Sequence, residues 1–144
     1  MLIRNVKNIF DETGDAVCVT TNGVVKANGK AVMGAGIAKE ANMRYHIAAQ
    51  LGHKLRTSGN HCYDLGSYDG KNLVSFPTKY DWRNDSDIEL IKQSCKELVQ
   101  LVDRNGWNTV LLPPVGCGCG KLDFNIIKTM LEQLLDDRFV LCVR

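Results

Sequence analysis

Short apolar runs alternate along the chain with segments whose apolar residues recur every three or four positions. Runs or alternations of apolar and β-branched residues predict strands at 2–7, 16–20, 62–68, 73–76, 109–113 and 139–143. The run Ala16–Thr20 lacks polar alternation, which is typical of a strand covered on both faces. Asp69–Gly70 separates the third and fourth of these segments and indicates a hairpin turn.

Helical periodicity fills the longer intervals between the predicted strands. One helix is predicted from Gly34 to about Leu51, where Gly52 would end it. Ser86–Glu89 has the spacing of a capping box and begins a second helix, which Asn105–Gly106 ends. A third is predicted at Phe124–Asp136. The apolar stripes of the last two are Ile88, Ile91, Cys95, Leu98, Val99 and Val102, and Ile126, Ile127, Met130, Leu131, Leu134 and Leu135.

Strands that alternate with helices indicate an α/β domain in which helices cover both faces of a mixed sheet. The 144 residues suffice for one hydrophobic core and are too few for two ordinary domains. No internal repeat, low-complexity tract or linker interrupts the pattern. We therefore predict a three-layer α/β/α architecture and a single domain, residues 1–144.

Composition narrows the functional classes. A hydrophobic content of 44% and a charged content of 24% are those of a globular protein in water, and a net charge of +2 is far from that of a dedicated nucleic-acid binder. The N-terminal residues do not form a signal peptide, and no apolar run has membrane-spanning length. We expect a cytoplasmic protein without a membrane partner.

Cysteines and histidines do not indicate a metal site. No C-x-x-C pair occurs, and the three histidines, His46, His53 and His61, are dispersed. A disulfide framework is not expected without an export signal. We expect no metal and no cofactor, and we interpret most of the cysteines as small buried residues. The six are Cys18, Cys62, Cys95, Cys117, Cys119 and Cys142.

The segment Leu111–Leu122 combines an apolar strand, two prolines and three glycines at alternate positions before a helix. Proline ends a strand because it lacks the N–H of the ladder, and glycine lets the backbone approach a ligand closely. With the helix N-terminus that follows, this arrangement favours a phosphate cradle. A tight strand-to-helix turn without a ligand explains the segment equally well.

Val32–Ala38 is a second glycine segment that leads into a helix. It lacks the third glycine of the dinucleotide fingerprint and the Gly-Lys-Ser/Thr of a P-loop, which disfavours ATP hydrolysis. Ligands of open α/β sheets bind at the carboxyl ends of the strands. Two glycine segments at that edge would clamp a diphosphate between their backbone N–H groups.

A specific resemblance to a known family rests on three segments taken together: Val19–Asn22, Val32–Ala38 and Pro113–Gly118. In order and spacing they resemble the macrodomain family of ADP-ribose-binding modules. Phe76–Arg83 is similar to a segment of its branch of DNA-directed ADP-ribosyl-glycohydrolase antitoxins, which stands beside the ADP-ribosyl-glutamate hydrolases. The resemblance implies a mixed sheet between helices, with ADP-ribose in a cleft over the strand ends.

The resemblance also implies ligand-binding residues. Asn8–Ile9 stands where the family has an Asp that binds adenine, and Asn22 would orient the distal ribose. A simple Asn22–Gly23 turn is the alternative at that position. The glycine segments would contact the diphosphate and the terminal ribose. The full set is Asn8, Ile9, Thr21, Asn22, Met33, Gly34, Ala35, Gly36, Ile37, Pro114, Val115, Gly116, Cys117, Gly118, Cys119 and Gly120.

Lys79 matches the lysine that is catalytic in the similar hydrolases and is expected to act at C1″ of the ribose. Trp82 and Arg83 are candidates for contact with a nucleic-acid substrate, although Trp82 also fits a core position. The glutamate-directed hydrolases carry an Asp where this chain has Gly120, as the DNA-directed antitoxins do. Asp123 is interpreted as the N-cap of the final helix.

The expected function is therefore binding of ADP-ribose with hydrolysis of an ADP-ribosyl linkage to DNA or protein, by a monomer. Two alternatives remain open. One is dephosphorylation of ADP-ribose-1″-phosphate, and the other is a reader that binds ADP-ribose without turnover.

Overall fold

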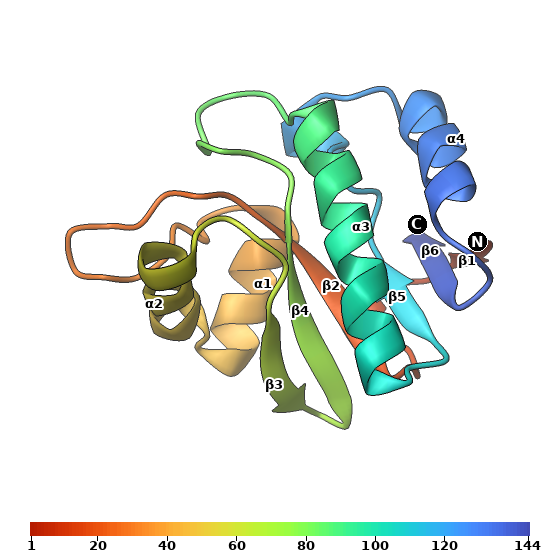
Figure 1. Ribbon diagram of the computed structural model, residues 1–144, viewed down its shortest axis with the longest axis horizontal. Coiled ribbons are helices and arrows are strands. Elements are labelled where there is room, and N and C mark those ends of the chain that lie inside the picture. Colours follow the sequence, from red (N-terminus) through yellow and green to blue (C-terminus); the bar gives the residue numbers. More distant parts are fainter.

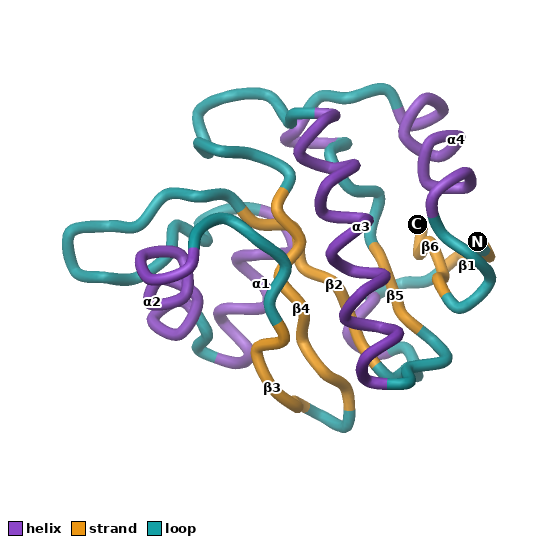
Figure 2. The backbone as a smooth tube through the Cα atoms, viewed as in Figure 1, coloured by secondary structure: helices purple, strands orange, loops and turns teal.

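The computed structural model describes residues 1–144 and contains one six-stranded mixed sheet (Figures 1 and 2). The order across the sheet is β1-β6-β5-β2-β4-β3. All neighbouring strands are parallel except the hairpin of β3 and β4. The strands are β1 (Leu2–Asn5), β2 (Ala16–Thr21), β3 (Asp64–Tyr68), β4 (Lys71–Pro77), β5 (Val110–Leu112) and β6 (Phe139–Val143).

Helices cover both faces of the sheet, which confirms the three-layer prediction. In Figure 1, α3 (Ile88–Asn105) lies in front of the sheet and α1 (Gly36–Tyr45) behind it. Residues of α4 (Phe124–Leu134) belong to the hydrophobic core on the α3 side of the sheet. Residues of α2 (Ala48–Ser58) belong to the core on the α1 side. Two short 3₁₀ helices, Ile9–Asp11 and Gly118–Gly120, complete the elements.

Strand β2 is the central element of both cores. Cys18 packs into the cluster on the α3 side and Val19 into the cluster on the α1 side, and neither has any exposed surface. Successive side chains of a strand point to opposite faces, so a strand between two helical layers needs apolar residues at every position. The prediction from the unbroken apolar run is confirmed. No helix of the structure has both the length and the apolar character needed to cross a membrane.

The single helix predicted from Gly34 to Leu51 is wrong, because the chain breaks it into α1 and α2. His46 takes a left-handed conformation with φ of 53°, and the Asn42 side chain accepts a hydrogen bond from the Ala48 N–H. Gly52 lies inside α2 and does not end it. A Cβ atom on Gly52 would overlap the Gly29 carbonyl oxygen, so the glycine allows a loop to pack against the helix.

Smaller corrections concern helix ends and faces. The N-cap of α3 is Asp87, whose carboxylate accepts from the Leu90 N–H at 3.0 Å, and not Ser86. Asp123 caps α4 as predicted. The predicted apolar stripe of α4 is only half buried: Ile126 is 60% exposed and Leu134 43% exposed. Ile127, Leu131 and Leu135 are the residues of this stripe that are buried in the core cluster.

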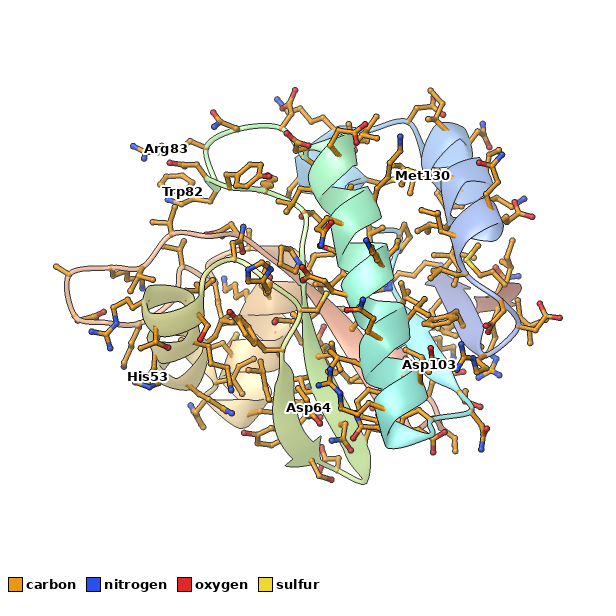
Figure 3. All side chains as sticks on the ribbon, in the orientation of Figure 1. His53, Asp64, Trp82, Arg83, Asp103 and Met130 are labelled. Carbon is orange, nitrogen blue, oxygen red and sulfur yellow. The ribbon has the colours of Figure 1, made fainter.

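We expect Gly52→Ala to destabilise the protein although alanine favours helices. The added methyl group must displace the loop backbone at Gly29, and such overpacking typically costs about 1–3 kcal/mol. Urea unfolding measures the effect. The neighbouring His53, which projects from α2 in Figure 3, is exposed and supplies the control variant His53→Ala. Equal stability of Gly52→Ala and the native protein would contradict the assigned packing.

Candidate functional site

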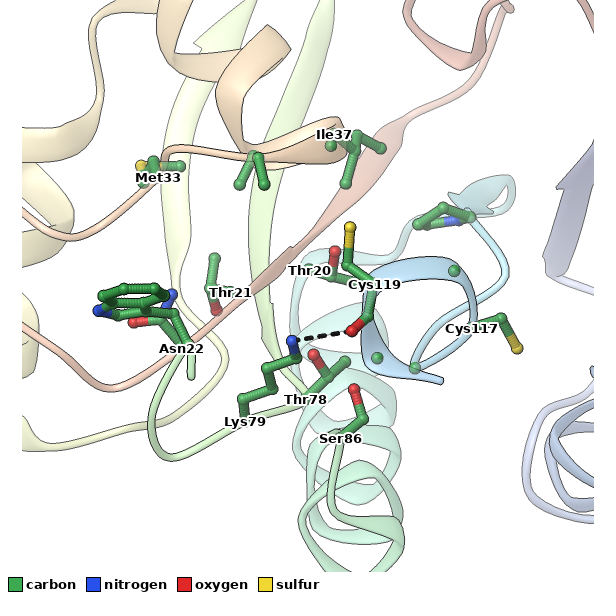
Figure 4. A pocket seen from close by; sticks show the side chains of 18 of the residues that line it. Thr20, Thr21, Asn22, Met33, Ile37, Thr78, Lys79, Ser86, Cys117 and Cys119 are labelled. Atoms are coloured by element: carbon green, nitrogen blue, oxygen red, sulfur yellow. Dashed lines mark hydrogen bonds between the residues drawn. The ribbon is translucent and has the colours of Figure 1, made fainter. Parts of the chain in front are cut away.

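A cleft of about 790 Å³ lies where β2, β4 and β5 end at the same edge of the sheet (Figure 4). Thr21 closes β2, Thr78 follows β4, and Pro113 follows β5, and all three line the cleft. Parallel strands bring their carboxyl ends together, so this position follows from the topology. Both glycine segments predicted from the sequence form walls of the cleft.

The first wall is Val32–Ala38, which contains the start of α1. Its N-cap, Ala35, has no side chain that accepts a hydrogen bond, and the first turn contains no acidic residue. None of the backbone N–H groups from Met33 to Ala38 donates a hydrogen bond within the protein. These free N–H groups lie at the positive end of the helix dipole, and together they favour an anion.

The second wall is the turn between β5 and α4. Gly116 and Gly118 have φ angles of +77° and +67°, which glycine adopts readily. The N–H groups of Val115, Gly116, Gly118 and Cys119 have no partner within the protein. This turn therefore borders the cleft with unused donors, as the first wall does. The Val115 side chain, in contrast, is fully buried in the core.

Lys79 connects the two sides of the cleft. Its ammonium group donates to the Cys119 carbonyl oxygen at 3.2 Å, across the space seen in Figure 4. An ammonium group has three N–H donors, so two remain for a ligand. The side chain belongs to the loop that leaves β4 and runs to α3. Lys79 thus contacts the second wall directly and lines the same cleft as the first wall.

Asn22 lines the cleft but already uses part of its amide. Its Nδ2 donates to the Val32 carbonyl oxygen at 3.0 Å, and its Oδ1 accepts from the Val24 N–H at 3.0 Å. The side chain therefore forms the turn that was the alternative at this position, and it also fixes the start of the first wall. One N–H of the amide remains available to a ligand.

Asn8 and Ile9 do not line the cleft. Asn8 Oδ1 accepts from the Phe10 N–H at 2.9 Å, and Nδ2 donates to Glu40 Oε1 at 2.8 Å. The side chain thus holds the short 3₁₀ helix against α1. Binding of adenine by Asn8 stays a prediction, and the two bonds already fix the orientation of the amide that would make it.

Trp82 and Arg83 lie together at the tip of the loop between β4 and α3 (Figure 3). Trp82 lines the cleft and is 51% exposed, so the alternative of a core position is wrong. Arg83 does not line the cleft; its Nε donates to Asp81 Oδ1 at 2.9 Å, and its guanidinium lies 5.6 Å from the Trp82 ring. Hydrogen bonds from Arg83 lower the pKa of the Asp81 carboxyl to about 2. Asp81 thus largely neutralises this cation.

Several hydroxyl groups at the cleft were not found from the sequence. Thr20, Thr78 and Ser86 line it, and the hydroxyls of Ser86 and Thr21 are buried without a hydrogen-bond partner in the protein. Ser86 reaches the site only through a tertiary contact, since its N–H donates to the Gly120 carbonyl oxygen at 3.0 Å. The remaining lining residues missed were Val32, Ala38 and Pro113.

Gly120 has no space for a side chain. A Cβ atom there would overlap the Ser86 hydroxyl and would lie 3.0 Å from Ser86 Cβ. A carboxylate at this position would therefore require Ser86 to move. This chain has no acidic residue at position 120, and Ser86 occupies the space that the side chain of such a residue would need.

We expect Gly120→Ala to lower the free energy of unfolding by about 1–3 kcal/mol, because the methyl group meets Ser86. In a Ser86→Gly background the obstructing atoms are gone, and the same substitution should cost less. Urea unfolding of the two single variants and the double variant measures this coupling. Strictly additive losses would show that the two residues do not compete for the same space.

Comparison with known proteins agrees with this geometry. The DNA ADP-ribosyl glycohydrolase of Mycobacterium tuberculosis (strain ATCC 25618 / H37Rv) is 30% identical over 136 residues, which cover 86% of this chain and 39% of that protein. The Thermus aquaticus protein of the same description is 27% identical over 143 residues, which cover 94% of this chain and 38% of that protein. This chain thus spans about two fifths of these relatives.

Solved structures show the same fold. The macrodomain of Mycobacterium tuberculosis DarG superposes with a TM-score of 0.84 at 25% identity, over 100% of this chain and 98% of that one. The macrodomain of Thermus aquaticus DarG gives 0.80 at 26% identity, over 99% and 98%. A family model described as Macro domain matches residues 24–131. The chain therefore belongs to the macro domain family.

Proposed function

We propose that this chain binds ADP-ribose in the cleft and hydrolyses an ADP-ribosyl linkage, with Lys79 as the catalytic residue. The observation that carries the proposal is the pair of glycine walls, whose unpartnered N–H groups border a single cleft that Lys79 also lines. Backbone donors at a helix N-terminus suit a diphosphate, and no arginine in the cleft is needed. The names of the relatives supply the reaction class.

The ligand would lie with its diphosphate between the two walls and its distal ribose near Asn22 and Lys79. In hydrolysis, the oxygen of water bonds to C1″, the bond from C1″ to the modified group breaks, and that group leaves with a proton. Lys79 would act at C1″. Because Gly120 leaves no room for a carboxylate, positioning and backbone electrostatics would supply most of the acceleration.

DNA is the favoured carrier of the linkage. The half-exposed Trp82 ring at the rim of the cleft offers a face on which a base would stack, whereas Arg83 is paired with Asp81. The relatives are named as acting on DNA. A single domain, a monomeric state and a cytoplasmic location remain predictions.

We expect Lys79→Ala to reduce release of ADP-ribose from an ADP-ribosylated oligonucleotide by about 10²-fold or more, as is typical for loss of a catalytic group. Single-turnover assays measure the rate. Calorimetry should show that the variant still binds ADP-ribose, because the glycine walls are intact. Lys92→Ala, which removes an exposed lysine on α3, serves as the control.

Parallel assays with ADP-ribosylated protein and with ADP-ribose-1″-phosphate identify the substrate class. Lysine-dependent turnover of one of these, and not of the oligonucleotide, would overturn the preference for DNA. Binding of ADP-ribose without any turnover would make the protein a reader. Absence of ADP-ribose binding would refute the whole assignment.

A further inference from the structure

Lys79 lies on a segment whose main chain is fixed at three consecutive positions. The carbonyl oxygens of residues 78–80 each accept a hydrogen bond from a different part of the chain. The donors are, in that order, the Asp87 N–H at 2.9 Å, Asn60 Nδ2 at 3.1 Å and the Gly23 N–H at 3.2 Å. The peptide groups on both sides of Lys79 are therefore held from outside the cleft.

Asn60 is the one member of this set that uses a side chain. The bonds from Asp87 and Gly23 are made by the main chain, and ordinary substitutions do not remove them. The bond from Asn60 to the Lys79 carbonyl oxygen depends on residue type. It is thus the contact through which the sequence controls the position of the Lys79 backbone.

The surroundings of Asn60 make it a rigid support. It follows Gly59, the C-cap of α2, whose N–H donates to the Leu55 carbonyl oxygen at 3.1 Å. The Gly59 carbonyl oxygen in turn accepts from the Tyr63 hydroxyl at 2.6 Å. Asn60 Oδ1 is buried and has no hydrogen-bond partner in the protein, so the bond from Nδ2 to the Lys79 carbonyl oxygen is the one that orients the amide.

We propose that Asn60 is a positioning residue for Lys79: its amide fixes the Lys79 peptide so that the ammonium group reaches across the cleft to the Cys119 turn. The inference rests on the proposed catalytic role of Lys79. Asn60 does not line the cleft, so its loss leaves both glycine walls in place. A displacement of about 1 Å at a reacting group costs up to about 10²-fold in rate.

Two substitutions test the proposal in the full chain. Asn60→Asp keeps the shape of the side chain and removes the donor, and Asn60→Ala removes the whole amide. Both should lower kcat on the oligonucleotide substrate by about tenfold, while the affinity for ADP-ribose stays within about twofold of the native value. The loss in Asn60→Asp should diminish as the pH falls, because a protonated carboxyl group donates again.

Asn72→Ala is the matched control. Asn72 is half-buried at the start of β4, far from the end that leads to Lys79, and its side chain donates to Asp64 at 3.0 Å. This variant should lose stability and keep its kcat.

The outcomes separate this inference from the proposed function. Unchanged kcat in both Asn60 variants, with turnover abolished in Lys79→Ala, would overturn the positioning role alone. An equal loss of kcat in Asn72→Ala would also overturn it, because the effect would then be one of general stability. Full turnover by Lys79→Ala would refute the catalytic role of Lys79, the part of the proposed function on which this inference rests.

Discussion

Unpartnered backbone N–H groups are the constraint on which the cleft depends. The first N–H groups of a helix have no acceptor within the helix and are available to a cap, to water or to a ligand. This chain leaves two sets of N–H groups without an acceptor at one sheet edge, one at the start of α1 and one in the turn after β5. The parallel pairing of β2 with β4 and β5 places those segments opposite each other. The proposed ligand, with its two phosphate groups, would accept hydrogen bonds from both sets at once.

The same constraint accounts for the residues that surround the walls. Side-chain caps are missing where a ligand needs the donors, whereas α3 and α4 are capped by Asp87 and Asp123. Asn22 holds the start of the first wall through the Val32 carbonyl oxygen. Lys79 is the cation at the cleft that is not paired with an acid, since Arg83 is occupied by Asp81.

The pattern of apolar and glycine residues predicted correctly those segments that have the same surroundings along their whole length. The unbroken apolar run of β2 required burial on both faces, and the glycine segments required an unusual backbone. The break between α1 and α2 was missed because Asn42 and His46 act there through backbone geometry, which apolar periodicity does not report. Ser86 was assigned to a cap on spacing alone, but its neighbour Asp87 does the capping.

The glycine walls of the site could be predicted because glycine and proline mark them in the sequence. Residues that join the site through tertiary contacts carry no such local signal. Ser86 and Asn60 reach the cleft and Lys79 through contacts with segments distant in the sequence, namely Gly120 and the Lys79 carbonyl oxygen. The resemblance also implied that Asn8 binds adenine. In the structure the Asn8 side chain bonds to Phe10 and Glu40.

The most direct test is an NMR titration of the ¹⁵N-labelled protein with ADP-ribose, read at the backbone amides. We predict that the largest shifts fall on Met33–Ala38 and on Val115, Gly116, Gly118 and Cys119, the amides that have no acceptor in the protein. Adenosine without phosphate should leave both groups nearly unchanged. Saturable binding with shifts confined to other parts of the chain would contradict the account.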